Sequence, residues 1–360
     1  MDSQFQIIPA DQYTIYLGSV FNALNEFISS QYADRKIFIL GDSNTLDHCL
    51  PVLDFNDVTS LKDAEVLEVE PGEESKSVEV LEVLWKSLIE LEIDRKSLVI
   101  NLGGGMVSDL GGFMAGTIKR GVDFINIPTT LLSMVDASVG GKVGVNLAGW
   151  KNQVGIFVHP KAVYVDPVFL ETLPKRELIA GTAEVYKHAL IYDADYWELV
   201  KYELGDVNET NWESILLRSI TIKNEVVQSD FKEEGLRKIL NFGHTIGHAF
   251  ESWSHLKQKP LLHGEAVAAG MWCEALLSNK LGLLDDKSLQ EILQLLENRF
   301  DLVSVNEQDI SLLVALMYKD KKNEGSTLNF SLIQEIGKSV FDQVIPENTV
   351  VEAIQAYIDR

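Results

Sequence analysis

The sequence has only two cysteines among its 360 residues, Cys49 and Cys273, and they lie far apart. They form neither a CxxC motif nor a disulfide framework, as is usual in a reducing cytosol. Residues 1–12 lack the basic start and apolar stretch of a secretory signal. No apolar run approaches the roughly 20 residues that a membrane helix needs. We therefore expect a cytoplasmic protein with no membrane partner.

Positive charge is also scarce. Lysine and arginine total 31 against 54 aspartates and glutamates, a formal net charge of −23. Such a surface repels phosphate backbones and anionic lipid, so nucleic acid is excluded as a partner. The 46% hydrophobic content allows a sizeable core. A chain of this length exceeds the roughly 250–300 residues of one core, which favours two domains.

Short β-rich runs alternate with helical patterns in the first half of the chain. The strands are expected at residues 36–40, 64–69, 97–101, 123–127 and 162–166, and a helix is expected over 75–91. Strands that alternate with helices predict a parallel α/β sheet. We predict that residues 1–174 form a Rossmann-like α/β domain.

Long amphipathic patterns replace this alternation after residue 174. They predict helices at roughly 175–192, 208–229, 236–254, 263–281 and 307–319, and a single strand at 328–333. We predict that residues 175–360 form a helical domain.

A glycine turn follows one of the expected buried strands. Gly103, Gly104 and Gly105 come between that strand and a helix, and glycines there let a helix N-terminus approach a pyrophosphate. The spacing is not GxGxxG, and three glycines can also be only a tight turn. Four residues in nearby loops could reach the rest of a nucleotide or could simply be solvated: Asp42, Asn44, Glu73 and Lys76.

Polar side chains then crowd the segment 128–142. Its hydroxyl and carboxylate residues stand among apolar ones: Thr129, Thr130, Ser133, Asp136 and Ser138. Lys142 follows two glycines, and Lys151 and Asn152 come soon after. The pattern indicates a buried, hydrogen-bonded site for a phosphate or carboxylate, or else a well-capped loop with an exposed lysine.

Three segments hold candidate metal ligands. Glu184 lies within an expected helix, His244 and His248 share one helix face at i, i+4, and His263 starts another helix. Carboxylate and imidazole ligands are typical of a catalytic divalent metal such as zinc. Spacing alone selects His244 and His248 as the pair, and the alternative is a set of hydrogen-bonded core histidines.

Cations surround these segments in an otherwise acidic chain. Arg237 precedes Asn241 by four residues on the same expected helix face, and Lys187 follows Glu184 by three. Lys223 lies on a mostly apolar stripe. These groups fit an anionic substrate. Each can also be an ordinary surface ion pair.

Taken in order, several strings of the chain resemble the 3-dehydroquinate synthase family of sugar-phosphate cyclases. They extend over about residues 36–337: GGGMVSD (103–109), PTTLL (128–132), DASVGGK (136–142), KN (151–152), AEVYK (183–187), GLR (235–237), LNFGHTIGH (240–248), HGEAV (263–267) and DKK (320–322). The chain departs from the family's usual Ala-Gly at Gly111-Gly112 and from its usual Ile at Tyr186.

The resemblance implies an NAD-binding domain followed by a metal-binding one, with the active site between them. It implies Glu184, His244 and His263 as metal ligands, so that His248 faces the substrate. It places the following around NAD: Asp42, Asn44, Glu73, Lys76, Gly104, Gly105, Met106, Asp109, Thr129, Thr130, Leu132, Asp136, Lys142, Lys151, Phe169, Thr172 and Leu173. It places the following around the substrate: Arg120, Lys142, Lys151, Asn152, Lys187, Lys223, Arg237, Asn241, His248 and Lys322. Lys321 is the alternative to Lys322, and Arg120 is expected to come from the partner subunit of a homodimer.

The implied reaction converts 3-deoxy-D-arabino-heptulosonate 7-phosphate to 3-dehydroquinate and phosphate. A ring hydroxyl is oxidised by NAD, phosphate is eliminated, the hydride is returned and an aldol step closes the carbocycle. Zinc is the expected metal, and cobalt also suits the ligands. The rival interpretations are another sugar-phosphate cyclase, a metal-dependent polyol or glycerol-phosphate dehydrogenase, and a catalytically inactive NAD-binding protein.

Overall fold

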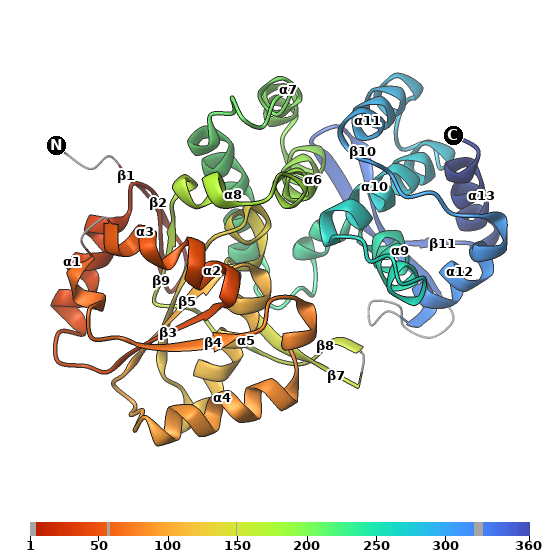
Figure 1. The fold of residues 1–360 in the computed structure, drawn as a ribbon. Helices are drawn as coiled ribbons and strands as arrows, with labels where there is room; N and C mark the ends of the chain where they lie inside the picture. Colours follow the sequence, from red (N-terminus) through yellow and green to blue (C-terminus); the bar gives the residue numbers. More distant parts are fainter. Residues whose placement is uncertain (1–4, 56–57, 149, 320–326) are drawn as a thin grey trace. The chain divides into compact units, whose positions relative to one another are not determined.

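The computed structural model describes residues 5–55, 58–148, 150–319 and 327–360. The chain divides into two compact units, which are treated separately (Figure 1). Unit 1 comprises Met1–Pro174 and Trp212–Asn224, and unit 2 comprises Lys175–Asn211 and Glu225–Arg360. The domain boundary at residue 174 remains a prediction. The helix α8 (Trp212–Ser229) contributes to both units.

Unit 1 contains a seven-stranded sheet with the order β1-β2-β9-β6-β5-β3-β4. Its strands are β1 (Phe5–Pro9), β2 (Thr14–Gly18), β3 (Ile37–Asp42), β4 (Glu65–Val69), β5 (Leu98–Gly103), β6 (Asp123–Pro128) and β9 (Ala162–Val165). All pairs are parallel except β1 with β2. The five predicted strands are present within two residues of their expected bounds, whereas β1 and β2 were not predicted.

The strand order creates a switch point between β5 and β3. The chain runs from β3 outward to β4, then returns to the other side of β3 with β5 and continues outward to β6 and β9. In such sheets, ligands bind beyond the carboxyl ends of the strands where the direction reverses. The ends of β3 and β5 are Asp42 and Gly103, two positions that the sequence placed near a nucleotide.

Helices cover the sheet of unit 1 and shape its turns. They are α1 (Phe21–Gln31), α2 (Ser43–His48), α3 (Leu50–Phe55), α4 (Val78–Glu90) and α5 (Gly105–Thr117), with short 3₁₀ turns η1 (Thr59–Leu61), η2 (Glu73–Ser75), η3 (Ile118–Arg120) and η5 (Pro167–Thr172), and a π-helical turn η4 (Ser133–Ala137). The expected helix 75–91 is α4, which begins later than expected, at Val78, because Ser75 ends the preceding 3₁₀ turn and Ser77 is extended. Phe38 and Leu40 of β3 pack against α4 and α5, while Ile37 and Ile39 point to the opposite face.

A glycine lets α5 lie directly on β5. A Cβ atom at Gly111 would come within 1.9 Å of Asn101 Oδ1, and Asn101 Nδ2 donates to Asn126 Oδ1 of the next strand at 2.9 Å. An alanine, which is usual in the family at this position, would therefore clash with the buried side chain of Asn101.

Two strands of unit 1 form an antiparallel hairpin that the sequence did not predict. Its strands are β7 (Lys142–Leu147) and β8 (Trp150–Phe157). Val143 packs against Gly112 and Ile156 against Gly116 of α5. Lys142 and Asn152 therefore lie on strands.

Unit 2 is mainly helical, as predicted. Its elements are α6 (Lys175–Tyr192), α7 (Ala194–Glu203), η6 (Leu236–Asn241), α9 (His244–Leu256), α10 (His263–Lys280), α11 (Asp286–Arg299), η7 (Glu307–Asp309), α12 (Ile310–Lys319) and α13 (Glu347–Ile358). The predicted strand at 328–333 is β10 (Leu328–Glu335). The prediction of a single strand is wrong, since β10 pairs with β11 (Lys338–Ile345) in a hairpin. The expected helix starts at 208 and 307 were early, since α8 begins at Trp212 and α12 at Ile310.

The predicted helix 236–254 is wrong as a single element. It is a 3₁₀ turn, η6, followed by a break and then by α9. Gly243 has φ +80, a left-handed conformation that ends one element before the next begins. Arg237 and Asn241 therefore do not share the face of an α-helix, because a 3₁₀ helix repeats every three residues.

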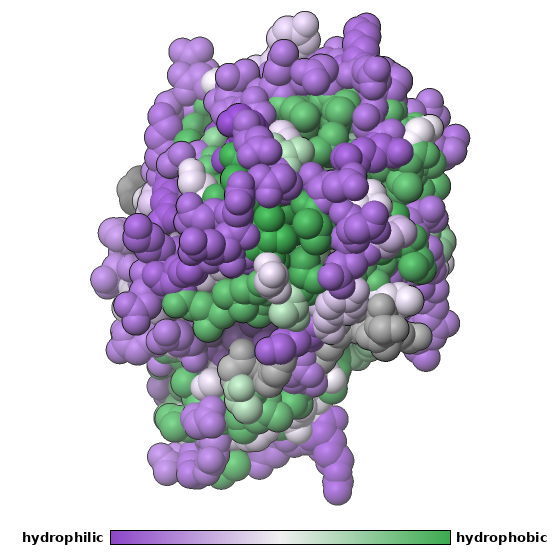
Figure 2. Space-filling view, turned by 90° about the vertical axis from the view of Figure 1, so that its right-hand side faces the viewer, coloured by the Kyte–Doolittle hydropathy of each residue, from purple (hydrophilic) through white to green (hydrophobic). Residues whose placement is uncertain are grey.

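Hydrophilic side chains predominate on the face of the molecule in Figure 2, as the net charge of −23 implies. Apolar side chains appear between them without forming one continuous patch. Among the described helices, none combines the length and apolarity needed to cross a membrane.

Candidate active site

Glycines bring three helices of unit 2 into backbone contact. A Cβ atom at Gly264, the second residue of α10, would lie 1.8 Å from the carbonyl oxygen of Ala180 in α6. A Cβ atom at Gly270 of α10 would lie 1.9 Å from the carbonyl oxygen of Gly243, just before α9. Only glycine permits approaches of this kind. Helices α6, α9 and α10 can therefore present side chains to one point.

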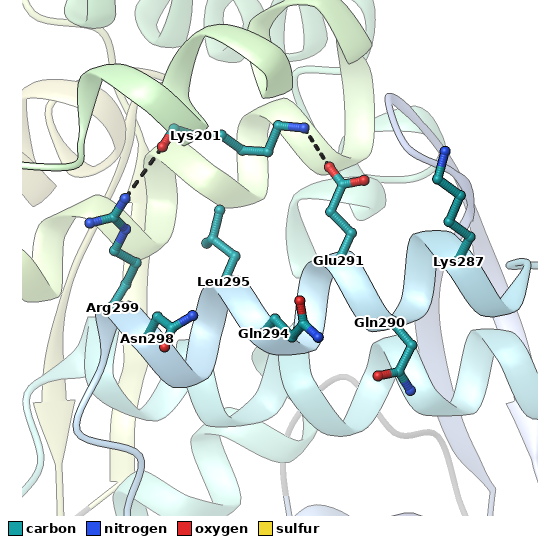
Figure 3. A pocket seen from close by; sticks show the side chains of 8 residues that line it. All are labelled: Lys201, Lys287, Gln290, Glu291, Gln294, Leu295, Asn298 and Arg299. Atoms are coloured by element: carbon teal, nitrogen blue, oxygen red, sulfur yellow. Dashed lines mark hydrogen bonds and ion pairs between the residues drawn. The ribbon is translucent and has the colours of Figure 1, made fainter.

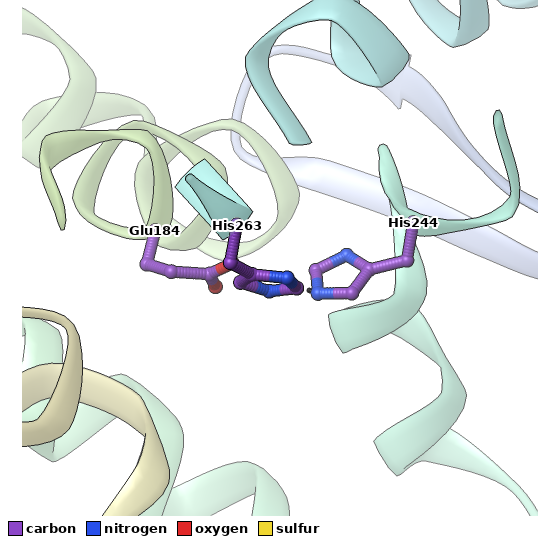
Figure 4. A group of neighbouring side chains, drawn as sticks. All are labelled: Glu184, His244 and His263. Atoms are coloured by element: carbon purple, nitrogen blue, oxygen red, sulfur yellow. Dashed lines mark ion pairs between the residues drawn. The ribbon is translucent and has the colours of Figure 1, made fainter. Parts of the chain in front are cut away.

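Glu184, His244 and His263 meet at that point (Figure 4). Glu184 is on α6, and the two histidines are the first residues of α9 and α10. The Nε2 atoms of His244 and His263 lie 3.5 and 3.7 Å from Glu184 Oε1. The glutamate is completely buried, and this oxygen accepts no hydrogen bond from the described residues.

The other nitrogen of each imidazole is held by an acceptor. His244 Nδ1 lies 3.1 Å from the carbonyl oxygen of Phe242, and His263 Nδ1 lies 3.3 Å from Glu251 Oε2. An Nδ1–H that donates to such acceptors fixes the tautomer in which Nε2 carries a lone pair. Both lone pairs are then directed at the Glu184 side of the cluster.

A divalent metal fits this donor set. Two imidazole nitrogens and one carboxylate are a usual set of protein ligands for a catalytic metal that keeps an open position. Bonds of about 2.0–2.2 Å in a tetrahedral arrangement separate neighbouring ligands by roughly 3.3–3.6 Å. The observed separations of 3.5 and 3.7 Å are close to those values.

His248 belongs to a neighbouring arrangement. Its ring centre is 5.3 Å from that of His244 and 5.9 Å from that of His263. Its ligand atoms group with those of Glu251 and His263. The pair selected by the i, i+4 spacing, His244 and His248, therefore competes with a set that brings in Glu184 and His263 from other helices.

Cations and their partners line the same part of unit 2. Lys187 is almost fully buried and forms an ion pair with Glu184 one helical turn away. Arg237 is 2% exposed, and its Nη1 donates to the carbonyl oxygen of Phe231 at 2.7 Å. Asn241 Nδ2 donates to Glu233 Oε1 at 2.9 Å. Lys187 and Arg237 are thus buried cations and not the surface ion pairs of the alternative interpretation.

A carboxylate fixes the turn that precedes Arg237. The side chain of Asp230 accepts hydrogen bonds from the backbone N–H groups of Glu234, Gly235 and Arg237. Desolvation acts to raise the pKa of Asp230, but the three N–H donors outweigh it and the pKa is lowered. The ionised form therefore holds the turn at neutral pH.

In unit 1, the turn after β5 meets the polar segment after β6. Gly104 precedes the first residue of α5, and its missing Cβ atom would lie 3.1 Å from Thr130 Cγ2. The Thr129 N–H donates to the Gly103 carbonyl oxygen at 3.0 Å. Ser133 Oγ donates to the Thr130 carbonyl oxygen at 2.9 Å. Thr129, Ser133 and Ser138 are buried, as predicted, and Thr130 is partly buried. The residue that precedes α5 lies beside this segment.

Lys76 differs from the solvated loop residue that the sequence allowed. It is 4% exposed, and its Nζ lies 2.5 Å from both Asp109 Oδ2 and Asn152 Oδ1. Glu73 lies 3.8 Å from the same ammonium group. Burial raises the pKa of the Asp109 carboxyl more than Lys76 lowers it. Lys76 thereby joins a residue expected at NAD to one expected at the substrate.

Lys223 is also buried and has a carboxylate partner within unit 1. Its ammonium group pairs with Asp136, which lies in the π-helical turn η4. The apolar stripe predicted around Lys223 is present, since Leu216, Ile220 and Val227 are buried on the same helix.

The remaining predicted residues have diverse surroundings. Asp42 caps α2 and accepts from the Thr45 N–H at 2.9 Å, and the side chain of Phe169 is buried against Phe21. Partly or fully exposed positions are Asn44, Met106, Arg120, Leu132, Lys142, Lys151, Thr172 and Leu173. Arg120 has φ +69. Lys321 and Lys322 lie outside the described residues.

A surface pocket in unit 2 contains none of the predicted site residues (Figure 3). It is lined by side chains of α7 and α11: Lys201, Lys287, Gln290, Glu291, Gln294, Leu295, Asn298 and Arg299. Glu291 accepts from both Lys201 Nζ and Trp197 Nε1, and Arg299 donates to the Lys201 carbonyl oxygen. These groups connect two helices, so we assign the pocket a structural role.

Two adjoining families match most of the chain. Residues 66–180 match the 3-dehydroquinate synthase N-terminal family, and residues 181–323 match the 3-dehydroquinate synthase C-terminal family. The chain belongs to the 3-dehydroquinate synthase family. A 3-dehydroquinate synthase of Parabacteroides distasonis is 39% identical over 97% of this chain and 98% of its own. That of Clostridium beijerinckii is 40% identical over 90% and 92%.

Solved structures of related cyclases share the fold. A 2-deoxy-scyllo-inosose synthase complexed with carbaglucose-6-phosphate, NAD+ and Co2+ has a TM-score of 0.85 at 26% identity, covering 98% of this chain and 100% of that one. An NADH-dependent butanol dehydrogenase of Thermotoga maritima has a TM-score of 0.67 at 15% identity, covering 97% and 98%, which shows a shared fold alone. The predicted family, synthase activity and α/β fold are confirmed.

Two residues near the cluster of Glu184, His244 and His263 were missed by sequence reasoning. Glu251 contacts His263, and Glu274 accepts hydrogen bonds at the start of α9. Glu251 follows His244 by seven residues, a spacing that places both on one helix face. Nothing local in the sequence distinguishes Glu274, because its partners lie 28 and 31 residues away.

Proposed function

We propose that the protein is a 3-dehydroquinate synthase that uses catalytic NAD and one divalent metal, preferably zinc. The substrate would be 3-deoxy-D-arabino-heptulosonate 7-phosphate, and the products 3-dehydroquinate and phosphate. The observation that carries the proposal is the Glu184, His244 and His263 cluster with the buried ammonium of Lys187 beside it. A metal beside buried cations suits a substrate with vicinal hydroxyls and negative charge.

Glu184, His244 and His263 would hold the metal. When bound, NAD would accept and return one hydride, and the metal would polarise a substrate oxygen. The tautomers set by Phe242 and Glu251 leave both Nε2 atoms ready to coordinate.

The substrate's charge would be met by buried cations. The ammonium groups of Lys187 and Lys223 and the guanidinium of Arg237 are buried, so that their interaction with an anion is weakly screened by water. Further contacts are proposed for Arg120, Lys142, Lys151, Asn152, Asn241 and Lys322. His248 would move a proton, since histidine titrates near neutral pH.

NAD would lie at the carboxyl ends of β3, β5 and β6. The N-terminus of α5 after Gly104 could bind the pyrophosphate of NAD, because the first N–H groups of a helix have no partner within the helix. Asp42 would face the adenosine half, whereas Thr129, Thr130 and Asp136 would surround the nicotinamide half. Phe169 would contribute its backbone, because its side chain is in the core.

A homodimer in the cytoplasm completes the proposal. Both cysteines are buried free thiols, which supports a reducing compartment. The partner subunit would supply Arg120, which stands on an exposed turn with left-handed backbone at Lys119 and Arg120.

Incubation of the purified protein with the heptulosonate phosphate, substoichiometric NAD and zinc tests the proposal. Phosphate release over many turnovers without net NADH absorbance is expected, and NMR of the product distinguishes 3-dehydroquinate from the products of sister cyclases. Stoichiometric NADH without phosphate would overturn the synthase in favour of a dehydrogenase. No reaction with bound NAD and metal would overturn this substrate.

A further inference from the structure

Helices α9 and α10 hold each other's first residues through two buried glutamates. Glu251 of α9 places Oε2 3.3 Å from Nδ1 of His263, the first residue of α10. Glu274 of α10 accepts from the backbone N–H groups of Gly243 and Ile246, at 2.6 and 3.0 Å, where α9 begins. Both glutamates are buried, at 6% and 0% exposure. Each helix thus starts with a histidine of the cluster and carries the carboxylate that supports the other start.

Glu251 acts on its histidine directly. A carboxylate that accepts from Nδ1–H fixes the ring rotation as well as the tautomer, and it increases the donor strength of Nε2. The Nε2 atom of His263 faces Glu184 Oε1 at 3.7 Å. A free rotation about the ring's attachment to the chain would move Nε2 away from that carboxylate.

Glu274 acts through the backbone. The first N–H groups of an α-helix have no partner within the helix, and a side-chain acceptor just before the helix usually satisfies them. Gly243 has no side chain to do so. The two oxygens of Glu274 supply this cap from the neighbouring helix instead. Because His244 lies between the two N–H groups that are bound, its backbone position is fixed by the same carboxylate.

We propose that Glu251 and Glu274 are positioning residues that together preorganise the metal site. The inference rests on the proposed metal role of Glu184, His244 and His263. It extends that role to two residues that do not touch the metal. Outer-sphere partners of this type typically contribute about 10–100-fold to metal affinity.

Metal binding to the full-length protein tests the inference. Zinc affinity is measured by competition with a chromophoric chelator, and the ligand field is followed by the visible absorption of the Co²⁺-loaded protein. Glu251→Ala is expected to weaken zinc binding about 10–100-fold and to change the Co²⁺ spectrum. Glu251→Gln is expected to recover most of the affinity, because its amide oxygen can still accept from Nδ1–H.

Glu274 is tested by the same pair of changes. Glu274→Gln has only one acceptor oxygen for two N–H donors, so about a 10-fold loss of affinity is expected, with a larger loss for Glu274→Ala. Glu297→Gln is the matched control. Glu297 accepts from Trp272 Nε1 at 2.8 Å, midway along α10 and away from its first residue.

The unfolding midpoint in EDTA separates positioning from support of the fold. Variants of Glu251 and Glu274 that lower the midpoint but bind zinc and show the Co²⁺ spectrum as Glu297→Gln does would overturn the inference. Wild-type protein that binds neither ion would instead overturn the proposed metal site itself. Loss of affinity beyond that of Glu297→Gln, with an altered spectrum, would support the inference.

Discussion

Replacement of Gly264 by alanine should weaken metal binding at the cluster of Glu184, His244 and His263 more than it weakens the fold. The new Cβ atom would lie 1.8 Å from the Ala180 carbonyl oxygen, whereas contacts below 3.0 Å are essentially never seen. The start of α10 must therefore move away from α6 by about 1.2 Å, because the obstacle is backbone and cannot rotate aside. Metal–ligand distances tolerate only about 0.2 Å. His263 would consequently leave coordination distance of a metal held by Glu184.

The expected loss of zinc affinity is at least about 100-fold, more than removal of an outer-sphere partner usually causes. The free energy of unfolding in EDTA should fall by about 3 kcal/mol, the upper part of the range for overpacking. Chelator competition measures the first quantity, and urea unfolding followed by tryptophan fluorescence measures the second.

Gly337→Ala is the matched control for this experiment. Gly337 lies in unit 2 with φ +86, and its Cβ atom would be 2.4 Å from the Ala194 backbone nitrogen, so a similar loss of stability is expected. Its backbone N–H donates to the Leu190 carbonyl oxygen at 2.8 Å, beyond Glu184 towards the end of α6, so zinc affinity should be retained. If Gly264→Ala bound zinc within about threefold of Gly337→Ala, the close approach of α6 and α10 would not be what positions His263.

Three further outcomes follow from the described contacts. Glu184→Gln should weaken zinc binding, and it should lower the free energy of unfolding by about 3 kcal/mol because the buried ammonium of Lys187 loses its carboxylate. Chelator competition and urea unfolding measure the two effects. Unchanged zinc affinity would contradict the ligand assignment. Lys223→Met should reduce the rate of phosphate release at least about 100-fold, whereas NAD affinity, measured by calorimetry, should change only a few-fold. Equal losses of both would contradict a substrate role for Lys223. Cys49 and Cys273 should react slowly with Ellman's reagent at pH 8 in the native protein and fully in denaturant. Both thiols are buried, and burial raises the pKa of the Cys49 thiol to about 11. A rapid reaction of the native protein would contradict that burial.

The parallel strands were predictable because each is a buried apolar run. All six positions of β5 are buried, and five of six in β3. The edge strand β1 was missed because only one of its five residues is buried, which leaves little hydrophobic pattern. The hairpin of β7 and β8 was missed because glycines interrupt it. At Gly144 and Gly155 the two strands leave no room for side chains, since each Cβ atom would lie 2.7 Å from a backbone oxygen of the other strand.

The candidate metal ligands were predictable as residue types, but their arrangement in space was not. Periodicity indicates which residues share a helix face, so it favours His244 with His248. It does not report that Gly243 ends one element and makes His244 the first residue of the next. Nor does it report which helices come into backbone contact. The set with Glu184 and His263 followed from the family resemblance, and the structure supplies the physical reason for it in the glycine contacts of α10.

The fold alone does not distinguish a cyclase from a dehydrogenase, because alcohol dehydrogenases share it. Under the proposed function, the buried cations would make the distinction. A buried ammonium group is costly unless it is paired, and here Lys187 and Lys223 are paired with Glu184 and Asp136. Oxidation of a neutral alcohol needs no such groups. Under the proposed function, a substrate that carries a carboxylate and loses a phosphate would bring negative charge to these ammonium groups, which could then divide their hydrogen bonds between the substrate and their carboxylate partners.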